Sequence, residues 1–319
     1  AAMPTEFDLI EAFLQWQERP GKKKGVAVGP GDDCAVLDPA PDRQLVVSTD
    51  AQVEGVHFPP GLRSDIVGYR SIAVSLSDLA ASGASARYVT ICLTLPAGDK
   101  AWIEAFAKGV ALCCEEHGVS VIGGYLARGS VQVSVAACGS VARGPAWVRS
   151  GARAGDDLWM SGRIGATALA LDGFGVADLP SLRTLRSQRQ DGFMAAFLLP
   201  CPRLAIVSRL DPHVHAAIDL SDGLAGEVHH LARQSSLKAM VDAERIPIWP
   251  GADLAAALES DDSYELLLAA PRRARSTMES LTLPGGLPLS RIGEFITGSG
   301  VEFRSNRDAR LGRCGHEHF

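Results

Sequence analysis

Carboxylates recur in this chain where predicted strands and helices meet, in both halves of the sequence. They occur in the segments Gly31-Asp32-Asp33-Cys34, Ser48-Thr49-Asp50, Leu76-Ser77-Asp78-Leu79 and Asp219-Leu220-Ser221-Asp222-Gly223. If these acids converge, two carboxylates about 4 Å apart repel each other by roughly 4 kcal/mol at an effective dielectric constant near 20. The pattern therefore predicts a folded site in which bound cations offset this repulsion.

The first half of the chain alternates between helical and strand-like patterns. Apolar residues at helical spacing predict an amphipathic helix over 7–17, which Thr5 can cap. In a second helix, over 68–81, Asp78 lies on a polar stripe opposite the apolar one. A strand over 45–47 is expected to end at Ser48. The other predicted elements are strands over 88–95, 119–122 and 131–141 and a helix over 102–117.

The second half begins after the turn signal Arg143-Gly144-Pro145, the expected domain boundary. A strand over 158–160, a helix from Ala166, a strand over 216–218 and a helix over 224–231 follow, with a polar surface stretch over 178–191. Mixed helices and strands in two halves predict an α/β (α+β) protein. We expect an N-terminal domain over 1–145 and a C-terminal domain over 146–319.

Composition excludes several functional classes. The net charge of -6 gives no basic surface for nucleic acid or an anionic membrane. No apolar run approaches the roughly 20 residues that span a bilayer, so we expect a cytoplasmic protein without a membrane partner. The seven cysteines include no Cys-x-x-Cys pair, which argues against a disulfide framework and a zinc site.

Oxygen-rich segments of this kind suit magnesium, which commonly joins protein carboxylates to the phosphates of a substrate. The chain has no Gly-x-x-x-x-Gly-Lys-Ser/Thr loop, so a nucleotide has to be held by metal bridges, glycine-rich turns and an arginine, for which Arg149 is the candidate. A single Asp beside a Gly is more often a turn or helix cap. We therefore interpret Asp156-Asp157 as a turn, and His57 can equally be structural.

Taken together, these segments resemble the thiamine-monophosphate kinase family over nearly the full chain. The motifs that carry the resemblance are Asp32-Asp33-Cys34-Ala35-Val36, Ser48-Thr49-Asp50-Ala51-Gln52-Val53-Glu54-Gly55-Val56-His57-Phe58, Leu76-Ser77-Asp78-Leu79, Arg149-Ser150-Gly151-Ala152-Arg153, Asp219-Leu220-Ser221-Asp222-Gly223-Leu224 and Tyr264-Glu265-Leu266. The resemblance implies the two-domain fold of the aminoimidazole ribonucleotide synthetase superfamily, with an N-terminal mixed sheet and a C-terminal α/β domain. It also implies a homodimer formed through the N-terminal sheets.

By resemblance, the protein is a kinase that transfers the γ-phosphoryl group of ATP directly to thiamine monophosphate, with several magnesium ions. No covalent intermediate and no strong general base are expected. The implied magnesium ligands are Asp33, Ser48, Thr49, Asp50, Asp78, Asp219 and Asp222. The implied ATP contacts are Gly124, Tyr125, Arg149 and Ser221. The implied substrate contacts are His57, Asp262 and His316.

The chain departs from the family pattern in three motifs. Tyr125 replaces a magnesium-binding Asp, and a phenol that is neutral at pH 7 cannot supply that charge. Asp262-Ser263 replaces Glu-Asp, and His316 replaces an aromatic residue. Two alternatives to the kinase therefore stay open. One is a degenerate paralogue that binds nucleotide or thiamine phosphate without efficient turnover, and the other is a related ATP-dependent enzyme with a different small substrate.

Overall fold

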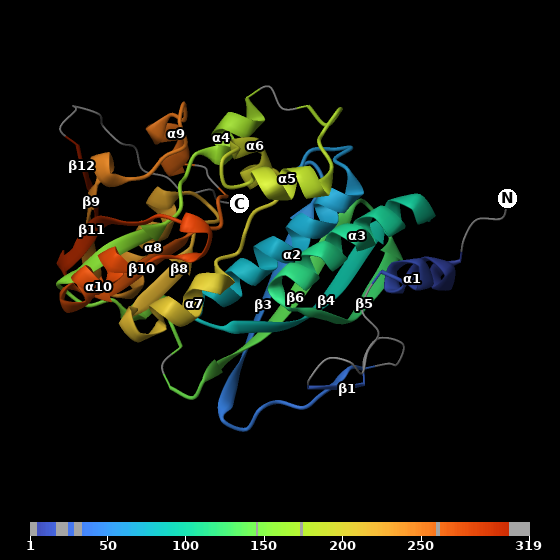
Figure 1. The fold of residues 1–319 in the computed structure, drawn as a ribbon, viewed down its shortest axis with the longest axis horizontal. Helices are drawn as coiled ribbons and strands as arrows, with labels where there is room; N and C mark the ends of the chain where they lie inside the picture. Colours follow the sequence, from blue (N-terminus) through green and yellow to red (C-terminus); the bar gives the residue numbers. More distant parts are fainter. Residues whose placement is uncertain are drawn as a thin grey trace. The chain divides into compact units, whose positions relative to one another are not determined.

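The computed structural model describes residues 5–16, 25–28, 34–144, 146–172, 175–259 and 262–305. The chain forms two compact units. The first comprises Ala1–Leu79, Ala84–Gly144 and Gly175–Ser187, and the second comprises Ala80–Gly83, Pro145–Phe174 and Gln188–Phe319. Each unit combines helices with its own sheet (Figure 1). No helix in the described ranges is long and apolar enough to cross a membrane.

The first unit is built on a four-stranded mixed sheet in the order β3-β6-β4-β5. The strands β3 and β4 pair antiparallel with β6, and β5 pairs parallel with β4. Its elements are α1 (Glu6–Leu14), β1 (Val26–Val28), β2 (Val36–Leu37), β3 (Arg43–Val53), α2 (Ser64–Ala81), β4 (Ser85–Leu95), α3 (Lys100–His117), β5 (Ser120–Arg128), β6 (Gln132–Ala142) and α5 (Leu182–Gln188).

Helices α2 and α3 lie side by side across one face of this sheet (Figure 1). Glycines allow their backbones to touch. A Cβ added at Gly68 would lie 2.2 Å from the carbonyl oxygen of Phe106, and one added at Gly109 would lie 1.8 Å from that of Asp65. Because small residues permit this approach, α2 is buried along almost its whole length. Ser71 and Ser75 of α2 are buried as well, and their hydroxyls donate to main-chain carbonyls one turn earlier.

The opposite face of the four-stranded sheet carries exposed side chains. Strand register places Val47, Cys138 and Tyr88 on this face, and Cys92 and Tyr125 lie on it beside each other. Val47 is 57% exposed and Tyr125 is 63% exposed. An exposed face with such large apolar and aromatic side chains is typical of a protein interaction surface. We call this surface, which also includes Leu45 and Thr49, the open face.

The second unit contains a six-stranded sheet in the order β12-β9-β11-β7-β10-β8. All neighbouring strands are antiparallel except β12 and β9. The strands are β7 (Asp156–Ser161), β8 (Ala216–Asp219), β9 (Leu237–Asp242), β10 (Leu266–Pro271), β11 (Leu289–Thr297) and β12 (Gly300–Arg304). The α-helices are α4 (Ala166–Leu171), α6 (Phe193–Leu198), α7 (Leu204–Leu210), α8 (Leu224–Gln234), α9 (Leu254–Glu259) and α10 (Arg275–Ser280).

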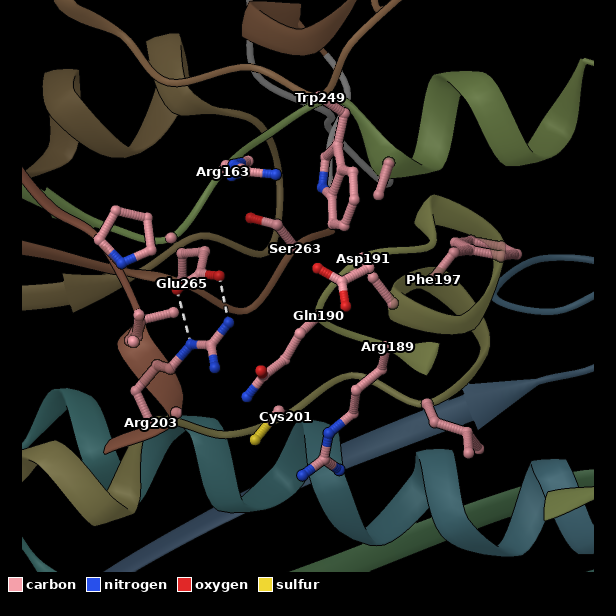
Figure 2. A pocket seen from close by; sticks show the side chains of 18 of the residues that line it. Arg163, Arg189, Gln190, Asp191, Phe197, Cys201, Arg203, Trp249, Ser263 and Glu265 are labelled. Carbon is pink, nitrogen blue, oxygen red and sulfur yellow. Dashed lines mark hydrogen bonds and ion pairs between the residues drawn. The ribbon is translucent and has the colours of Figure 1, made fainter. Parts of the chain in front are cut away.

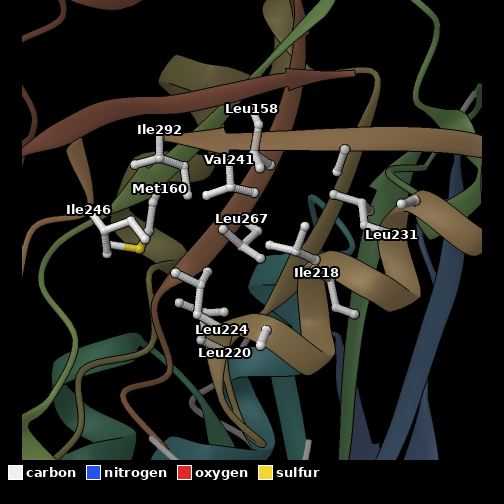
Figure 3. Packing of buried hydrophobic residues seen from close by; sticks show 14 of the residues in the cluster. Leu158, Met160, Ile218, Leu220, Leu224, Leu231, Val241, Ile246, Leu267 and Ile292 are labelled. Carbon is white, nitrogen blue, oxygen red and sulfur yellow. The ribbon is translucent and has the colours of Figure 1, made fainter. Parts of the chain in front are cut away.

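Both faces of this sheet are covered, and the strand sequences explain why. In β10, Leu267 and Ala269 join the core under α8, whereas Leu266 and Leu268 join the core under α7 and α10. Successive side chains of a strand point to opposite faces, so a continuous apolar run fits a strand that is buried on both sides. Figure 3 shows the core under α8, where Leu224 and Leu231 pack toward strand residues.

Several predicted element ends are wrong. Strand β3 continues through Ser48, Thr49 and Asp50 to Val53, because these residues pair with β6. The Asp156-Asp157 pair opens β7 instead of forming a turn. Asp157 is fully buried, and Arg275 satisfies its carboxylate with two hydrogen bonds, from Nε at 2.8 Å and from Nη2 at 2.5 Å.

Candidate functional site

The first group of predicted site residues lies on β3 and α2 of the first unit. Ser48 and Asp50 alternate onto the face of β3 that the helices cover, and the Ser48 hydroxyl donates a hydrogen bond to the Asp78 carboxylate on α2. The main-chain N–H of Ala51 donates to Oδ1 of Asp50 at 2.7 Å. The fold therefore brings a hydroxyl and carboxylates from distant sequence positions to one side of the sheet.

Thr49 and Tyr125 lie apart from this group, on the open face. Strand alternation turns the side chain of Thr49 to the opposite face of the sheet from those of Ser48 and Asp50. Gly124 pairs with Ile91, and an added Cβ there would lie 2.3 Å from the Ile91 carbonyl oxygen. A glycine is thus required at 124, and the following residue, Tyr125, projects to the open face.

His57 lies in the tight turn that follows β3. The N–H of Val53 donates to Nδ1 of His57 at 3.0 Å, and the N–H of His57 donates to the Val53 carbonyl at 2.9 Å. Because Nδ1 accepts this bond, a neutral His57 carries its proton on Nε2. The turn therefore fixes the ring as an Nε2 donor, which suits contact with an anionic group.

The second group lies in the turn between β8 and α8. Asp219 ends β8 and is only 4% exposed, and Ser221 and Asp222 follow in the turn. The N–H of Leu220 donates to the Glu265 carbonyl and the N–H of Tyr264 donates to the Leu220 carbonyl, both at 2.8 Å. Gly223 has φ of +96°, which favours glycine. The turn is therefore held on both sides by the segment that precedes β10.

Glu227, in the first turn of α8, belongs to the same group and was missed by the motif analysis. It is 4% exposed, and its Oε1 accepts a hydrogen bond from the Ser221 hydroxyl at 3.4 Å. Burial raises its pKa from 4.5 to about 8, with a further increase from the negative charges of Asp219 and Asp222 and an opposing effect of Arg149. A sequence signal existed, because Glu227 interrupts the apolar helical stripe that contains Leu224 and Leu231.

Arg149 lies in a short 3-10 helix, Arg149–Gly151, that is attached to the far end of α8. The Ser235 hydroxyl donates to the Arg149 carbonyl at 2.9 Å and accepts from the N–H of Ala152 at 3.2 Å. The guanidinium is exposed, and its charge acts on both Glu227 and His230. The charge of Arg149 therefore acts on a carboxyl group that also faces the charges of Asp219 and Asp222.

The raised pKa of Glu227 predicts that the stability of the metal-free protein depends on pH. Because the pKa is raised from 4.5 to about 8, its contribution to stability is complete below pH 4.5 and is lost as the pH rises toward 8. The loss reaches at most about 1.4 kcal/mol per pH unit. Urea unfolding with a chelator should show the wild type losing roughly 3 kcal/mol relative to Glu227→Gln between pH 5 and pH 8. Parallel stability curves would contradict this pKa.

Asp262 lines a cavity of about 170 Å³ in the second unit. Figure 2 shows it lined by Trp249, Phe197 and Ser263. Asp262 is fixed by Thr167, whose hydroxyl donates to Oδ1 and accepts from the Asp262 N–H. The hydroxyl of Ser263 is buried and has no hydrogen-bond partner among the described residues. Such a group at a cavity indicates a place for a polar ligand atom.

One wall of this cavity is an ion pair between Arg203 and Glu265 (Figure 2). Arg203 donates to both carboxylate oxygens, with Nε at 2.6 Å from Oε2, and the Ser161 hydroxyl donates to Oε2 at 2.5 Å. Gly162 lies against this carboxylate, because an added Cβ would be 1.8 Å from Oε1. The pair fixes Glu265 directly before β10.

Asp33 and His316, two predicted ligands, lie outside the described residues. Over the described ranges, no three histidine, cysteine, aspartate or glutamate side chains are arranged as a ready metal site. The structure thus forms two groups: Ser48, Asp50 and Asp78 in the first unit, and Arg149, Asp219, Ser221, Asp222 and Glu227 in the second.

Family comparison defines the class of protein to which this fold and these groups belong. A family described as AIR synthase related protein, N-terminal domain, matches residues 31–141, and its C-terminal domain counterpart matches residues 153–306. A thiamine-monophosphate kinase of Escherichia coli K12 is 32% identical over 325 residues, which cover 98% of each chain. Within the AIR synthase related class, the chain belongs to the thiamine-monophosphate kinase family.

Solved structures agree with this assignment and confirm the predicted two-domain fold class. The crystal structure of thiamine-monophosphate kinase from Stenotrophomonas maltophilia K279a is 35% identical, with a TM-score of 0.84, over 98% of this chain and 99% of that one. A structure described as AaThiL complexed with AMPPCP and TMP is 26% identical, with a TM-score of 0.72, over 100% of this chain and 99% of that one.

Proposed function

We propose that this protein phosphorylates thiamine monophosphate to thiamine diphosphate with ATP. The observation that carries the proposal is the turn after β8, where main-chain hydrogen bonds hold the segment of Asp219, Ser221 and Asp222 and the charge of Arg149 acts on the adjoining Glu227. It occurs in a chain that matches thiamine-monophosphate kinases over its full length. A phosphate oxygen of thiamine monophosphate attacks the γ-phosphorus of ATP, the bond to the β,γ-bridging oxygen breaks, and ADP leaves. Positioning and charge neutralisation supply the catalysis.

Magnesium fits the chemistry of both groups of residues. Ser48, Asp50 and Asp78 offer hydroxyl and carboxylate oxygens, and so do Asp219 and Asp222. The buried Oε2 of Glu227 has no partner among the described residues, a state that a nearby cation or its water would relieve. Bound magnesium ions would neutralise charge on the transferring phosphoryl group. The chain's own part is to hold these oxygens, while Arg149 and Ser221 contact ATP. Gly124 and Tyr125 remain proposed ATP contacts, with Asp33 and Thr49 as further proposed metal ligands.

The cavity around Asp262 is the proposed place for the organic part of thiamine monophosphate. Thiamine carries a quaternary thiazolium nitrogen, and aromatic faces and carboxylates attract such a cation. Trp249 and Phe197 supply aromatic rings, and Asp262 supplies a carboxylate. The free hydroxyl of Ser263 can bond a ring nitrogen or an amino group. His57, and His316 near the C-terminus, are further proposed substrate contacts.

The open face supports a homodimer as the proposed assembly. Its exposed Leu45, Val47 and Tyr125 form part of one sheet surface, and burying such side chains against a second copy is favourable by about 25 cal/mol per Å². Leu45 and Val47 supply the apolar part of such an interface.

Chromatography of a reaction that contains purified protein, ATP, magnesium and thiamine monophosphate tests the proposal. Thiamine diphosphate should form with thiamine monophosphate, and should not form with unphosphorylated thiamine or with a chelator. The neutral Tyr125 in place of the family's metal-binding Asp is the observation that favours the degenerate paralogue. Product that appears only in Tyr125→Asp would establish that alternative.

A further inference from the structure

Glu227 is an acidic side chain in a place where a helix normally buries apolar groups. It shares the inner face of α8 with Leu224, Val228 and Leu231, and it is 4% exposed. A carboxyl group in this position is costly unless its oxygens have partners. One of its oxygens accepts from the Ser221 hydroxyl, and the other, Oε2, is buried without a partner among the described residues.

Packing alone does not explain this choice of residue. The neighbours of Glu227 include the acids Asp219 and Asp222, whose negative charges oppose another carboxylate. An apolar residue at 227 would remove both the repulsion and the unpaired oxygen. The main-chain N–H of Glu227 already bonds the Gly223 carbonyl at 3.2 Å, so the side chain is not needed to start the helix. The acid therefore costs stability. Its side chain accepts a hydrogen bond from Ser221, in the turn formed by Asp219-Leu220-Ser221-Asp222.

We propose that Glu227 is a positioning residue of the nucleotide and metal site. Through Oε1 it orients the Ser221 hydroxyl, and through Oε2 it provides a carboxylate acceptor for water on a divalent cation held by Asp219 and Asp222. The inference rests on the proposed function for the roles of Ser221 and the two aspartates. Groups that accept hydrogen bonds from the direct ligands of a metal ion orient those ligands. Their removal typically lowers metal affinity by about 10- to 100-fold.

Two substitutions separate the two roles of Glu227. Glu227→Gln keeps an acceptor for Ser221 but cannot ionise to the carboxylate that a bound cation would favour, whereas Glu227→Leu removes both functions at similar volume. Calorimetry should measure the affinity for magnesium in the presence of a non-hydrolysable ATP analogue, and the affinity for the analogue at saturating magnesium. Glu279→Gln, on the exposed surface of α10, is the control for the loss of one negative charge.

The expected result is a magnesium affinity about tenfold lower in Glu227→Gln, with affinity for the ATP analogue close to that of the wild type. Glu227→Leu should also weaken binding of the analogue, and adding Ser221→Ala to it should weaken binding little further, because the two groups act as one unit. Thermal unfolding identifies variants that fail to fold, and if Glu227→Leu fails, Glu227→Gln decides the proposal.

A magnesium affinity in Glu227→Gln equal to that in Glu279→Gln would overturn the role of Oε2. Fully additive effects of Glu227→Leu and Ser221→Ala would overturn the role of Oε1. These results are distinct from failure of the proposed function, in which the wild type itself binds no ATP analogue or makes no thiamine diphosphate. If the wild type binds the ATP analogue and Glu227→Gln has the same magnesium affinity as the wild type, only the positioning role is rejected.

Discussion

Asp222→Asn is expected to reduce thiamine diphosphate formation at least about a thousandfold, and Asp50→Asn should do the same. Each substitution keeps the size of the side chain and removes one negative charge from a group proposed to hold magnesium. Metal stabilisation of a phosphoryl transition state contributes several kcal/mol, and about 4 kcal/mol corresponds to a thousandfold in rate. Steady-state rates at several magnesium concentrations measure the loss.

Asp253→Asn is the matched control for these two variants. Asp253 caps α9, where its Oδ1 accepts from the N–H of Ala256 at 2.9 Å, and Asn caps a helix as well as Asp does. This control should keep wild-type activity. Normal activity in both Asp50→Asn and Asp222→Asn would reject the assignment of the metal sites, even if the protein proves to be a kinase.

Glu265→Ala is expected to destabilise the second unit by roughly 3 kcal/mol, because it removes a buried carboxylate and leaves the half-buried guanidinium of Arg203 without its partner. The Ser161 hydroxyl, which donates to Glu265 and accepts from the N–H of Leu266, would lose its own acceptor. For a domain of this size the loss lowers Tm by on the order of 10 °C. Differential scanning calorimetry without ligands measures it.

The control is Glu302→Ala, which removes an acid from an exposed ion pair with Lys238. Exposed pairs contribute little because water solvates both charges and screens their attraction. Glu302→Ala should therefore unfold close to the wild-type Tm. Equal Tm values for the Glu265 and Glu302 variants would show that the Arg203 pair does not anchor β10 and the turn beside it.

Local sequence patterns predict much of the secondary structure because helical and strand periodicity are local properties. The helix from Leu224 and the strand before Asp219 are examples, and both lie close to their predicted bounds. Element ends were less predictable. Ser48, Thr49 and Asp50 look like a turn by residue type, yet pairing with β6, about 90 residues later in the chain, keeps them in a strand.

The parts of the candidate site that the sequence did not predict depend on contacts between distant residues. Arg203 and Glu265 are separated by 62 positions, and the cavity beside them combines Trp249, Phe197 and Asp262 from different segments. No local sequence pattern indicates that such distant residues lie together. Glu227 is different, because an acid within an apolar helical stripe is visible in the sequence and could have been identified.

The most direct test of the proposed activity is a single-turnover reaction with ATP labelled in its γ-phosphoryl group, magnesium and thiamine monophosphate. Direct transfer predicts that label leaves ATP and appears in the terminal phosphate of thiamine diphosphate, with one ADP formed for each product molecule and no labelled protein. Folded wild-type protein that binds ATP and thiamine monophosphate but transfers no label to thiamine diphosphate would contradict the proposed function.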